Sequence, residues 1–142
     1  MHQSVKNLNS IYEELRLLKD KVPSIIAVSK TFPVSSILPL IKEGHIHFGE
    51  NKVQEAVEKW SDIKKEFNTI KLHMIGKLQT NKVKYVIPLF DYIHSLDNLK
   101  LAEKIASEQK KINKNLKIFI QINIGNETQK SGIELSNLEN FY

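Results

Sequence analysis

The sequence predicts an α/β fold built on a parallel sheet, and three observations support this prediction. Short apolar runs that are typical of buried strands alternate about five times with amphipathic helical segments. The connections between these elements are short. With 142 residues, 41% of them hydrophobic, the chain is long enough for one domain with an ordinary core. The alternation is compatible with two architectures, an open doubly wound sheet and a (β/α) barrel.

The helices are expected from apolar spacing and from residues that begin or end a helix. Val5, Leu8, Leu15 and Leu18 recur at helical spacing and predict an amphipathic helix at the start of the chain. Four more helices are expected between the strands. The first begins after Pro33 and ends at Gly44, and the second begins after Gly49-Glu50-Asn51. The third runs from Gln79 to Val86 and is stopped by Pro88. The fourth has Asp97 or Asn98 as its N-cap and ends at Asn113 to Asn115.

The strands are expected where apolar and β-branched residues cluster. The five predicted strands are Ile25 to Lys30, Ile46 to Phe48, Ile70 to Ile75, Tyr92 to Leu96, and Leu116 to Ile124. A polar loop from Gly125 to Gly132 and the start of one more helix at Ser136 follow them. A closed barrel needs eight strands and about 200 to 250 residues. If the chain belongs to a barrel, it therefore holds only the first part of one.

Composition excludes several classes of protein. The net charge is +5, but the lysines are scattered over helix faces, so no specific nucleic-acid binding is expected. Cysteine is absent, which excludes a disulfide framework and a thiolate metal site. No apolar run approaches the roughly 20 residues that a spanning helix needs. We therefore expect a cytoplasmic protein without a membrane partner.

The first predicted strand, Ile25 to Lys30, carries the residue with the most distinctive chemistry. Lysine is the side chain that forms a Schiff base with an aldehyde or ketone. A lysine at the tip of a buried strand lies at the mouth of the structure that buries the strand. From the local sequence alone, Lys30 is either such a chemical handle or a solvated strand end, and the second role is the commoner one.

Several motifs occur in an order and at spacings that are typical of one family. They are Ala27-Val28-Ser29-Lys30-Thr31, Phe48 to Glu55 (FGENKVQE), Leu72 to Lys82 (LHMIGKLQTNK), His94 to Asp97, Gln121 to Ile124, and Glu127 to Gly132. Together they resemble the pyridoxal-phosphate homeostasis protein family, whose members are single-domain relatives of the alanine racemase barrel. The resemblance implies a partial (β/α) TIM-type barrel of the alanine racemase N-terminal type. About five of the eight β/α units are expected, in one incomplete, C-terminally truncated domain over residues 1–142.

The resemblance also implies a function and a set of site residues. It implies a protein of vitamin B6 homeostasis that holds pyridoxal 5′-phosphate (PLP) as a Schiff base on Lys30, without an established turnover of its own. Asn51 is expected either to offer its amide to the cofactor ring or to cap a helix. His73 is expected either near the cofactor or as a hydrogen-bonded core residue. Ser95 is either a residue of the barrel mouth or a neighbour of a helix cap, and Lys130 is either a second amine at the mouth or a solvated loop residue.

Two features depart from the family pattern. Many relatives have a basic residue two positions after the lysine, where this chain has Phe32. The phosphate-binding segments of the family belong to the late part of the barrel and are absent here, as are the loops after strands seven and eight that commonly hold phosphate. We therefore expect a second chain that supplies the missing barrel half, or self-association through open sheet edges.

Three alternatives remain open from the sequence. Lys30 could serve a Schiff-base aldolase that uses no phosphate cofactor. His45 and His47, together with His73 or His94, could ligate a metal in a hydrolase, although no carboxylate joins them. The chain could also be a weakly functional remnant of the family.

Overall fold

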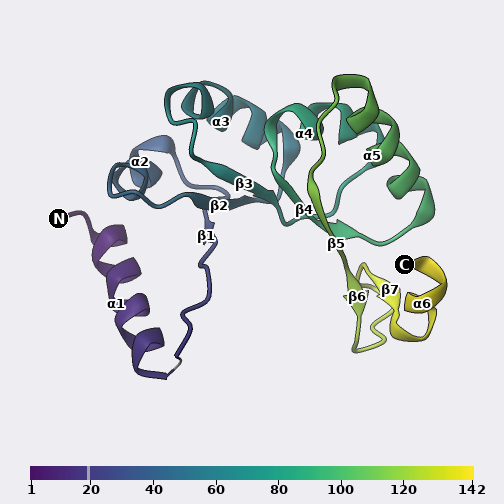
Figure 1. Ribbon diagram of the computed structural model, residues 1–142, viewed down its shortest axis with the longest axis horizontal. Helices are drawn as coiled ribbons and strands as arrows, with labels where there is room; N and C mark the ends of the chain where they lie inside the picture. The colour runs from purple at the N-terminus through teal and green to yellow at the C-terminus, as the bar shows by residue number, and fades with distance from the viewer. Residues whose placement is uncertain (19) are drawn as a thin grey trace.

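A five-stranded parallel sheet forms the centre of the molecule. The computed structural model describes residues 1–18 and 20–142. The strands lie in the order β1-β2-β3-β4-β5, so each pairs with its neighbour in sequence (Figure 1). Their bounds are β1 (Ala27–Val28), β2 (His47–Glu50), β3 (Lys71–Met74), β4 (Tyr92–Leu96) and β5 (Lys117–Ile120). This uninterrupted order is that of a (β/α) barrel wall, because a doubly wound sheet reverses its strand order at a switch point.

Helices cover one face of this sheet. The helices of the described chain are α1 (Gln3–Leu18), α2 (Val34–Lys42), α3 (Val53–Glu66), α4 (Val83–Leu89), α5 (Leu99–Ile112) and α6 (Leu138–Phe141), with 3-10 turns η1 (Thr80–Lys82) and η2 (Leu135–Asn137). In Figure 1, α2 to α5 lie above the sheet, and α1 and the C-terminal segment extend below its two ends. That segment contains β6 (Ile122–Asn123) and β7 (Ile133–Glu134), which pair in parallel. None of the helices described by the structure has the length and apolarity that crossing a membrane requires.

The hydrophobic core lies between the sheet and the helices. Successive side chains of a strand point to opposite faces, so every second residue of the inner strands enters this layer. Phe48, Leu72 and Ile93 are all fully buried there. The ring of Trp60 from α3 packs on Phe48 with centroids 5.0 Å apart. Each large side chain buried in this way stabilises the fold by roughly 1.5–3 kcal/mol, and together they fix the strand ends that carry the site.

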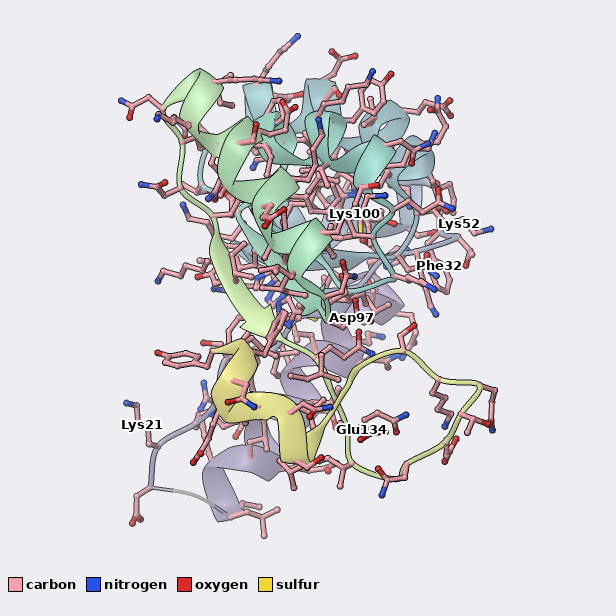
Figure 2. All side chains as sticks on the ribbon, turned by 90° about the vertical axis from the view of Figure 1, so that its right-hand side faces the viewer. Lys21, Phe32, Lys52, Asp97, Lys100 and Glu134 are labelled. Carbon is pink, nitrogen blue, oxygen red and sulfur yellow. The ribbon has the colours of Figure 1, made fainter. Side chains whose placement is uncertain are left out.

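The opposite face of the sheet, which we call the inner face, is largely uncovered in the described part of the chain. Val28 is 49% exposed and Phe119 is 51% exposed there. The prediction that the first strand is fully buried is therefore wrong, because only its other side, at Ala27, packs against the core. Figure 2 shows Phe32 and Lys52, which follow β1 and β2, on one side of the molecule and Lys21, which precedes β1, on the other. The carboxyl ends of these strands thus share one edge.

Three of the five predicted strands differ from the observed ones by two residues or more at one or both ends. β1 ends at Val28, because the chain turns at Ser29, whose carbonyl accepts a hydrogen bond from the amide of Phe32 at 3.2 Å. β2 continues through Gly49 and Glu50, which we had expected in a turn. The predicted strand Leu116 to Ile124 is broken at Gln121, where the chain leaves the sheet and β6 pairs with β7 instead.

Helix ends follow the sequence more closely. The side chain of Asn98 accepts a hydrogen bond from the amide of Leu101 at 2.9 Å, which confirms it as the N-cap of α5. That helix ends at Asn113, which has the left-handed conformation with φ 53°. α4 runs past the predicted stop at Pro88 by one residue. A proline removes only one helical hydrogen bond, and the burial of Val86 and Ile87 holds the last turn in place.

Candidate functional site

Lys30 lies in the turn that follows β1 and is exposed. The side chain before it, Ser29, is buried on the helix side, where its hydroxyl donates to Glu50 Oε1 at 2.9 Å. Ile26 lies on the inner face, because a Cβ on Gly49 would meet its side chain at 3.1 Å. Lys30 therefore follows a strand whose side chains alternate between the two faces, and it lies in the turn at the carboxyl edge of the sheet.

A buried polar network lies on the helix side of this turn, and sequence reasoning missed it. The ammonium of Lys59 donates to the Ser29 carbonyl at 2.8 Å and to Glu50 Oε1 at 2.8 Å. Trp60 Nε1 also donates to Glu50 Oε1, at 2.7 Å. Glu50 is fully buried, and its second oxygen has no partner among the described residues. The only local signal was the pair Glu55 and Lys59 at helical i,i+4 spacing, which does not reveal its partners in the turn.

Asn51 follows β2, so it neighbours Lys30 along the carboxyl edge of the sheet. It is not the N-cap of α3, because that position is Lys52, whose side chain makes no capping bond. Its Oδ1 atom is buried without a hydrogen-bond partner in the described structure. Gly76 packs against its backbone so closely that a Cβ there would lie 2.3 Å from the Asn51 carbonyl oxygen. The Asn51 side chain is thus fixed in place with an unused polar atom.

His73 is the centre of a row of imidazoles on the inner face. Its Nε2 lies 2.9 Å from His47 Nδ1, and its Nδ1 lies 2.8 Å from His94 Nε2. The His73 ring also stacks on Tyr92 with centroids 4.1 Å apart, and His94 stacks on Phe119 at 4.6 Å. Each of these hydrogen bonds needs one donor and one acceptor nitrogen, and three neutral rings can supply both.

Burial determines the charge state of these histidines. Burial, followed by the proximity of His94 and His47, lowers the pKa of His73 from 6.5 to about 4. Burial is also the largest cause that lowers the pKa of His47 and of His94 below the ordinary value. All three rings are therefore neutral near pH 7. Of the two roles that we considered for His73, the geometry shows a hydrogen-bonded histidine that stacks on the inner face.

Ser95 and Lys130 have different surroundings. Ser95 lies within β4 at an irregularity between Ile93 and Leu96, and it is 3% exposed. Its hydroxyl has no partner among the described residues. Lys130 lies in the loop between β6 and β7, outside the five-stranded sheet, and its ammonium pairs with Glu127 at 2.9 Å. The structure therefore places Lys30 and Asn51 after adjacent strands, His73 and Ser95 within the next two strands, and Lys130 in a separate loop.

The metal alternative receives no support from the geometry. Within residues 1–18 and 20–142, no three His, Cys, Asp or Glu side chains are arranged to hold a metal ion. The Nε2 atom of His45 lies 2.9 Å from the carbonyl oxygen of His47, and the His45 ring contacts the Phe48 ring edge-on. His47, by contrast, contacts His73 on the inner face. The two imidazoles of the His-x-His pattern therefore do not converge on one point.

The site can perform chemistry on a carbonyl compound. It offers a primary amine at the carboxyl edge of the sheet, and two buried polar atoms without partners, Asn51 Oδ1 and Ser95 Oγ. Buried polar atoms are rarely left without a partner, so they are candidates for contact with a bound molecule. These features fit an aldehyde cofactor that carries polar ring substituents. Fold and site together define a (β/α)-barrel protein with a lysine after its first strand.

Comparison with known proteins identifies the family. The profile of the alanine racemase N-terminal domain matches residues 6–142, and the chain belongs to this family. The chain is 39% identical over 135 residues to the pyridoxal phosphate homeostasis protein of Haemophilus influenzae. The alignment covers 90% of this chain and 56% of that relative. The resemblance inferred from the motifs is confirmed, and the chain spans about half the length of the relatives that it matches.

Solved structures agree with this assignment. The structure of PipY from Synechococcus elongatus without PLP aligns with a TM-score of 0.77 at 34% identity, covering 92% of this chain and 61% of PipY. The structure of the same protein with PLP bound aligns with a TM-score of 0.74 at 32% identity, covering 92% of this chain and 63% of PipY. The partial barrel of the alanine racemase N-terminal type is thereby confirmed.

Proposed function

We propose that this chain binds pyridoxal 5′-phosphate and takes part in the intracellular homeostasis of this form of vitamin B6. The observation that supports it best is the position of Lys30, an exposed amine in a hydrogen-bonded turn at the carboxyl edge of a parallel sheet. The chain's similarity to pyridoxal phosphate homeostasis proteins and to a PLP-bound PipY supports the choice of ligand. We place the protein in the cytoplasm and assign it no turnover of its own.

In this proposal, five residues of the chain contribute to cofactor binding in different ways. The unprotonated amine of Lys30 would add to the aldehyde carbon of the cofactor, and the carbonyl oxygen would leave as water, which gives a Schiff base. Asn51 and Ser95 offer their unpartnered oxygens to polar ring substituents. His73 presents a neutral edge on the inner face. Lys130 offers a second amine to the cofactor, and its ion pair with Glu127 must break before it can bind there.

Covalent labelling tests the role of Lys30. The purified chain is incubated with PLP, the visible imine absorbance is recorded, and borohydride fixes the adduct for peptide mapping. We expect one dominant labelled lysine, Lys30, and loss of that label in Lys30→Ala. Lys52→Ala, which removes another exposed lysine from the same edge of the sheet, is the matched control and should label normally. Dominant labelling elsewhere, or equal labelling of Lys30→Ala, would refute the assignment.

We propose further that residues 1–142 act as a single domain whose open strand edges are covered by another polypeptide segment or a second copy. Among the residues that the structure describes, β1 pairs only with β2 and β5 only with β4, which leaves two unpaired edges in the five-stranded sheet. Size-exclusion chromatography with light scattering should therefore show a species larger than the 16.4 kDa monomer. A strictly monomeric chain that binds PLP would contradict the need for such a partner.

The affinity for PLP is expected to be weaker than that of PipY. The family resemblance implies that the phosphate-binding segments belong to the late part of the barrel, beyond the units that residues 1–142 form, and each charge-assisted phosphate contact is worth roughly 1.5–3 kcal/mol. A side-by-side fluorescence titration of the two proteins measures the difference. Equal dissociation constants would mean that residues of this chain hold the phosphate.

A further inference from the structure

The turn that carries Lys30 has an unusual backbone. Thr31 adopts a φ of 66°, in the left-handed region that β-branched residues rarely enter. The amide of Phe32 donates to the carbonyl of Ser29 at 3.2 Å and closes the turn around Lys30 and Thr31. Strained backbone of this kind persists only where surrounding contacts hold it, and it is typical of functional sites.

Helix α3 supplies those contacts from the buried side. Glu55 Oε1 accepts a hydrogen bond from the Thr31 amide at 2.5 Å. Lys59 donates to the same carboxylate oxygen at 3.0 Å and to the Ser29 carbonyl at 2.8 Å. The turn is therefore held on both sides of Lys30, at the carbonyl of the residue before it and at the amide of the residue after it.

The network extends into the core through the side chain of Ser29. Its hydroxyl donates to Glu50 Oε1, which also accepts from Lys59 at 2.8 Å. The hydrogen bonds with Lys59 and with the Thr31 amide lower the pKa of Glu55, so the carboxylate stays charged near neutral pH. The side chain of Ser29 is thus fixed on the helix side, directly before Lys30 in the turn.

We propose that Glu50, Glu55 and Lys59 form a clamp that positions Lys30 for reaction with its carbonyl ligand. We call these three side chains the α3 clamp. Glu50 comes from β2 and the other two from α3. They are positioning residues that act through the hydroxyl and carbonyl of Ser29 and the amide of Thr31. This inference rests on the proposed function of Lys30. Its consequence is that the rate of Schiff-base formation depends on groups on the helix side of the sheet.

Substitution of Glu55 isolates the positioning effect. Glu55 is the most exposed member of the clamp, at 28% of its side chain, so Glu55→Ala should fold. Its imine with PLP should form at least about tenfold more slowly at Lys30, because a small displacement of a reacting group is costly. Glu55→Gln keeps the oxygen that accepts from Thr31 and should recover most of the rate. Glu58→Ala, an exposed glutamate of the same helix, is the matched control.

Amide hydrogen exchange of Thr31 tests the clamp without the cofactor. The amide should be protected in the wild type and in Glu55→Gln and Glu58→Ala, and should exchange rapidly in Glu55→Ala. If the wild type labels Lys30 but Glu55→Ala labels it equally fast, the clamp is refuted and the proposed function stands. If the wild type does not label Lys30, the proposed function fails, and with it the positioning role. An unprotected Thr31 amide in the wild type refutes the clamp geometry itself.

Discussion

Replacement of Lys59 by methionine should destabilise the fold more than any exposed lysine substitution. The Lys59 side chain is only 8% exposed, and its ammonium donates to the Ser29 carbonyl and to the carboxylates of Glu50 and Glu55. Methionine preserves the length of the side chain and removes the charge with all these hydrogen bonds. The carboxylate of Glu50, which is fully buried, then loses its cation and keeps only the hydroxyl of Ser29 and the indole of Trp60 as donors.

The magnitude follows from the burial of that carboxylate. Removing one partner of a buried ion pair costs roughly 3–5 kcal/mol, because the remaining charge is left uncompensated. This is a large part of the roughly 5–15 kcal/mol that stabilises a typical domain. Adding Glu50→Gln to the methionine variant removes the orphan charge. The double variant should therefore regain at least about 1 kcal/mol over Lys59→Met alone.

Urea unfolding followed by the fluorescence of Trp60, the only tryptophan, measures these differences. Lys65→Met is the matched control on the same helix, since Lys65 is 81% exposed and its substitution should change the free energy of unfolding by less than about 0.5 kcal/mol. A Lys59→Met variant within about 1 kcal/mol of the wild type would refute the reasoning. A double variant less stable than Lys59→Met would refute it as well, because it would mean that the orphan charge is not the cause.

Three further substitutions test other parts of the fold. Gly76→Ala should destabilise the chain by about 1–3 kcal/mol or more in the same urea assay, because its Cβ would lie 2.3 Å from the Asn51 carbonyl oxygen; a change under about 0.5 kcal/mol would show that the loops move apart freely. The pKa of His73 is lowered from 6.5 to about 4 in the folded state, so as the pH falls the unfolded state takes up a proton before the folded state does. The free energy of unfolding should therefore decrease between pH 6.5 and pH 4, by at most about 3 kcal/mol. His73→Phe should flatten that pH profile, whereas an unchanged slope would assign the effect to other groups. Asn98→Ala should cost about 1 kcal/mol through loss of the cap on Leu101, and thermal melting with unchanged midpoint would contradict the capping role.

Local patterns predicted the alternation of strands and helices because each element buries an apolar stripe that recurs with its own period. Tyr92 to Leu96 was predicted with the observed bounds, and residue type narrowed the N-cap of α5 to Asp97 or Asn98, of which the structure has Asn98. The break at Gln121 was not predicted, since apolar residues recur from Leu116 to Ile124 as in one continuous strand, and the pairing of β6 with β7 is what divides it. Pairing between distant segments leaves no signal in local periodicity.

The site was less predictable than the fold. Lys30 stood out because its chemistry is particular to its residue type, and Asn51 because it follows a glycine turn. The contacts that hold Lys30 in place join Thr31 to Glu55 and Ser29 to Lys59, positions 24 and 30 residues apart in sequence. Glutamate and lysine on an amphipathic helix are ordinarily solvated, so nothing in α3 indicated that two of them reach the turn after β1.

The chemistry of the α3 clamp favours a positioning role over a purely stabilising one. A buried ion pair can often be replaced by apolar side chains without loss of stability, so Glu50 and Lys59 are not needed to fill the core. The helix side of the sheet is otherwise largely apolar, with Phe48, Leu72 and Ile93 fully buried. Where α3 meets the turn that carries Lys30, hydrogen bonds from the clamp reach the carbonyl and the hydroxyl of Ser29 and the amide of Thr31. These hydrogen bonds are directional contacts that apolar side chains cannot supply, and they hold the backbone on both sides of Lys30.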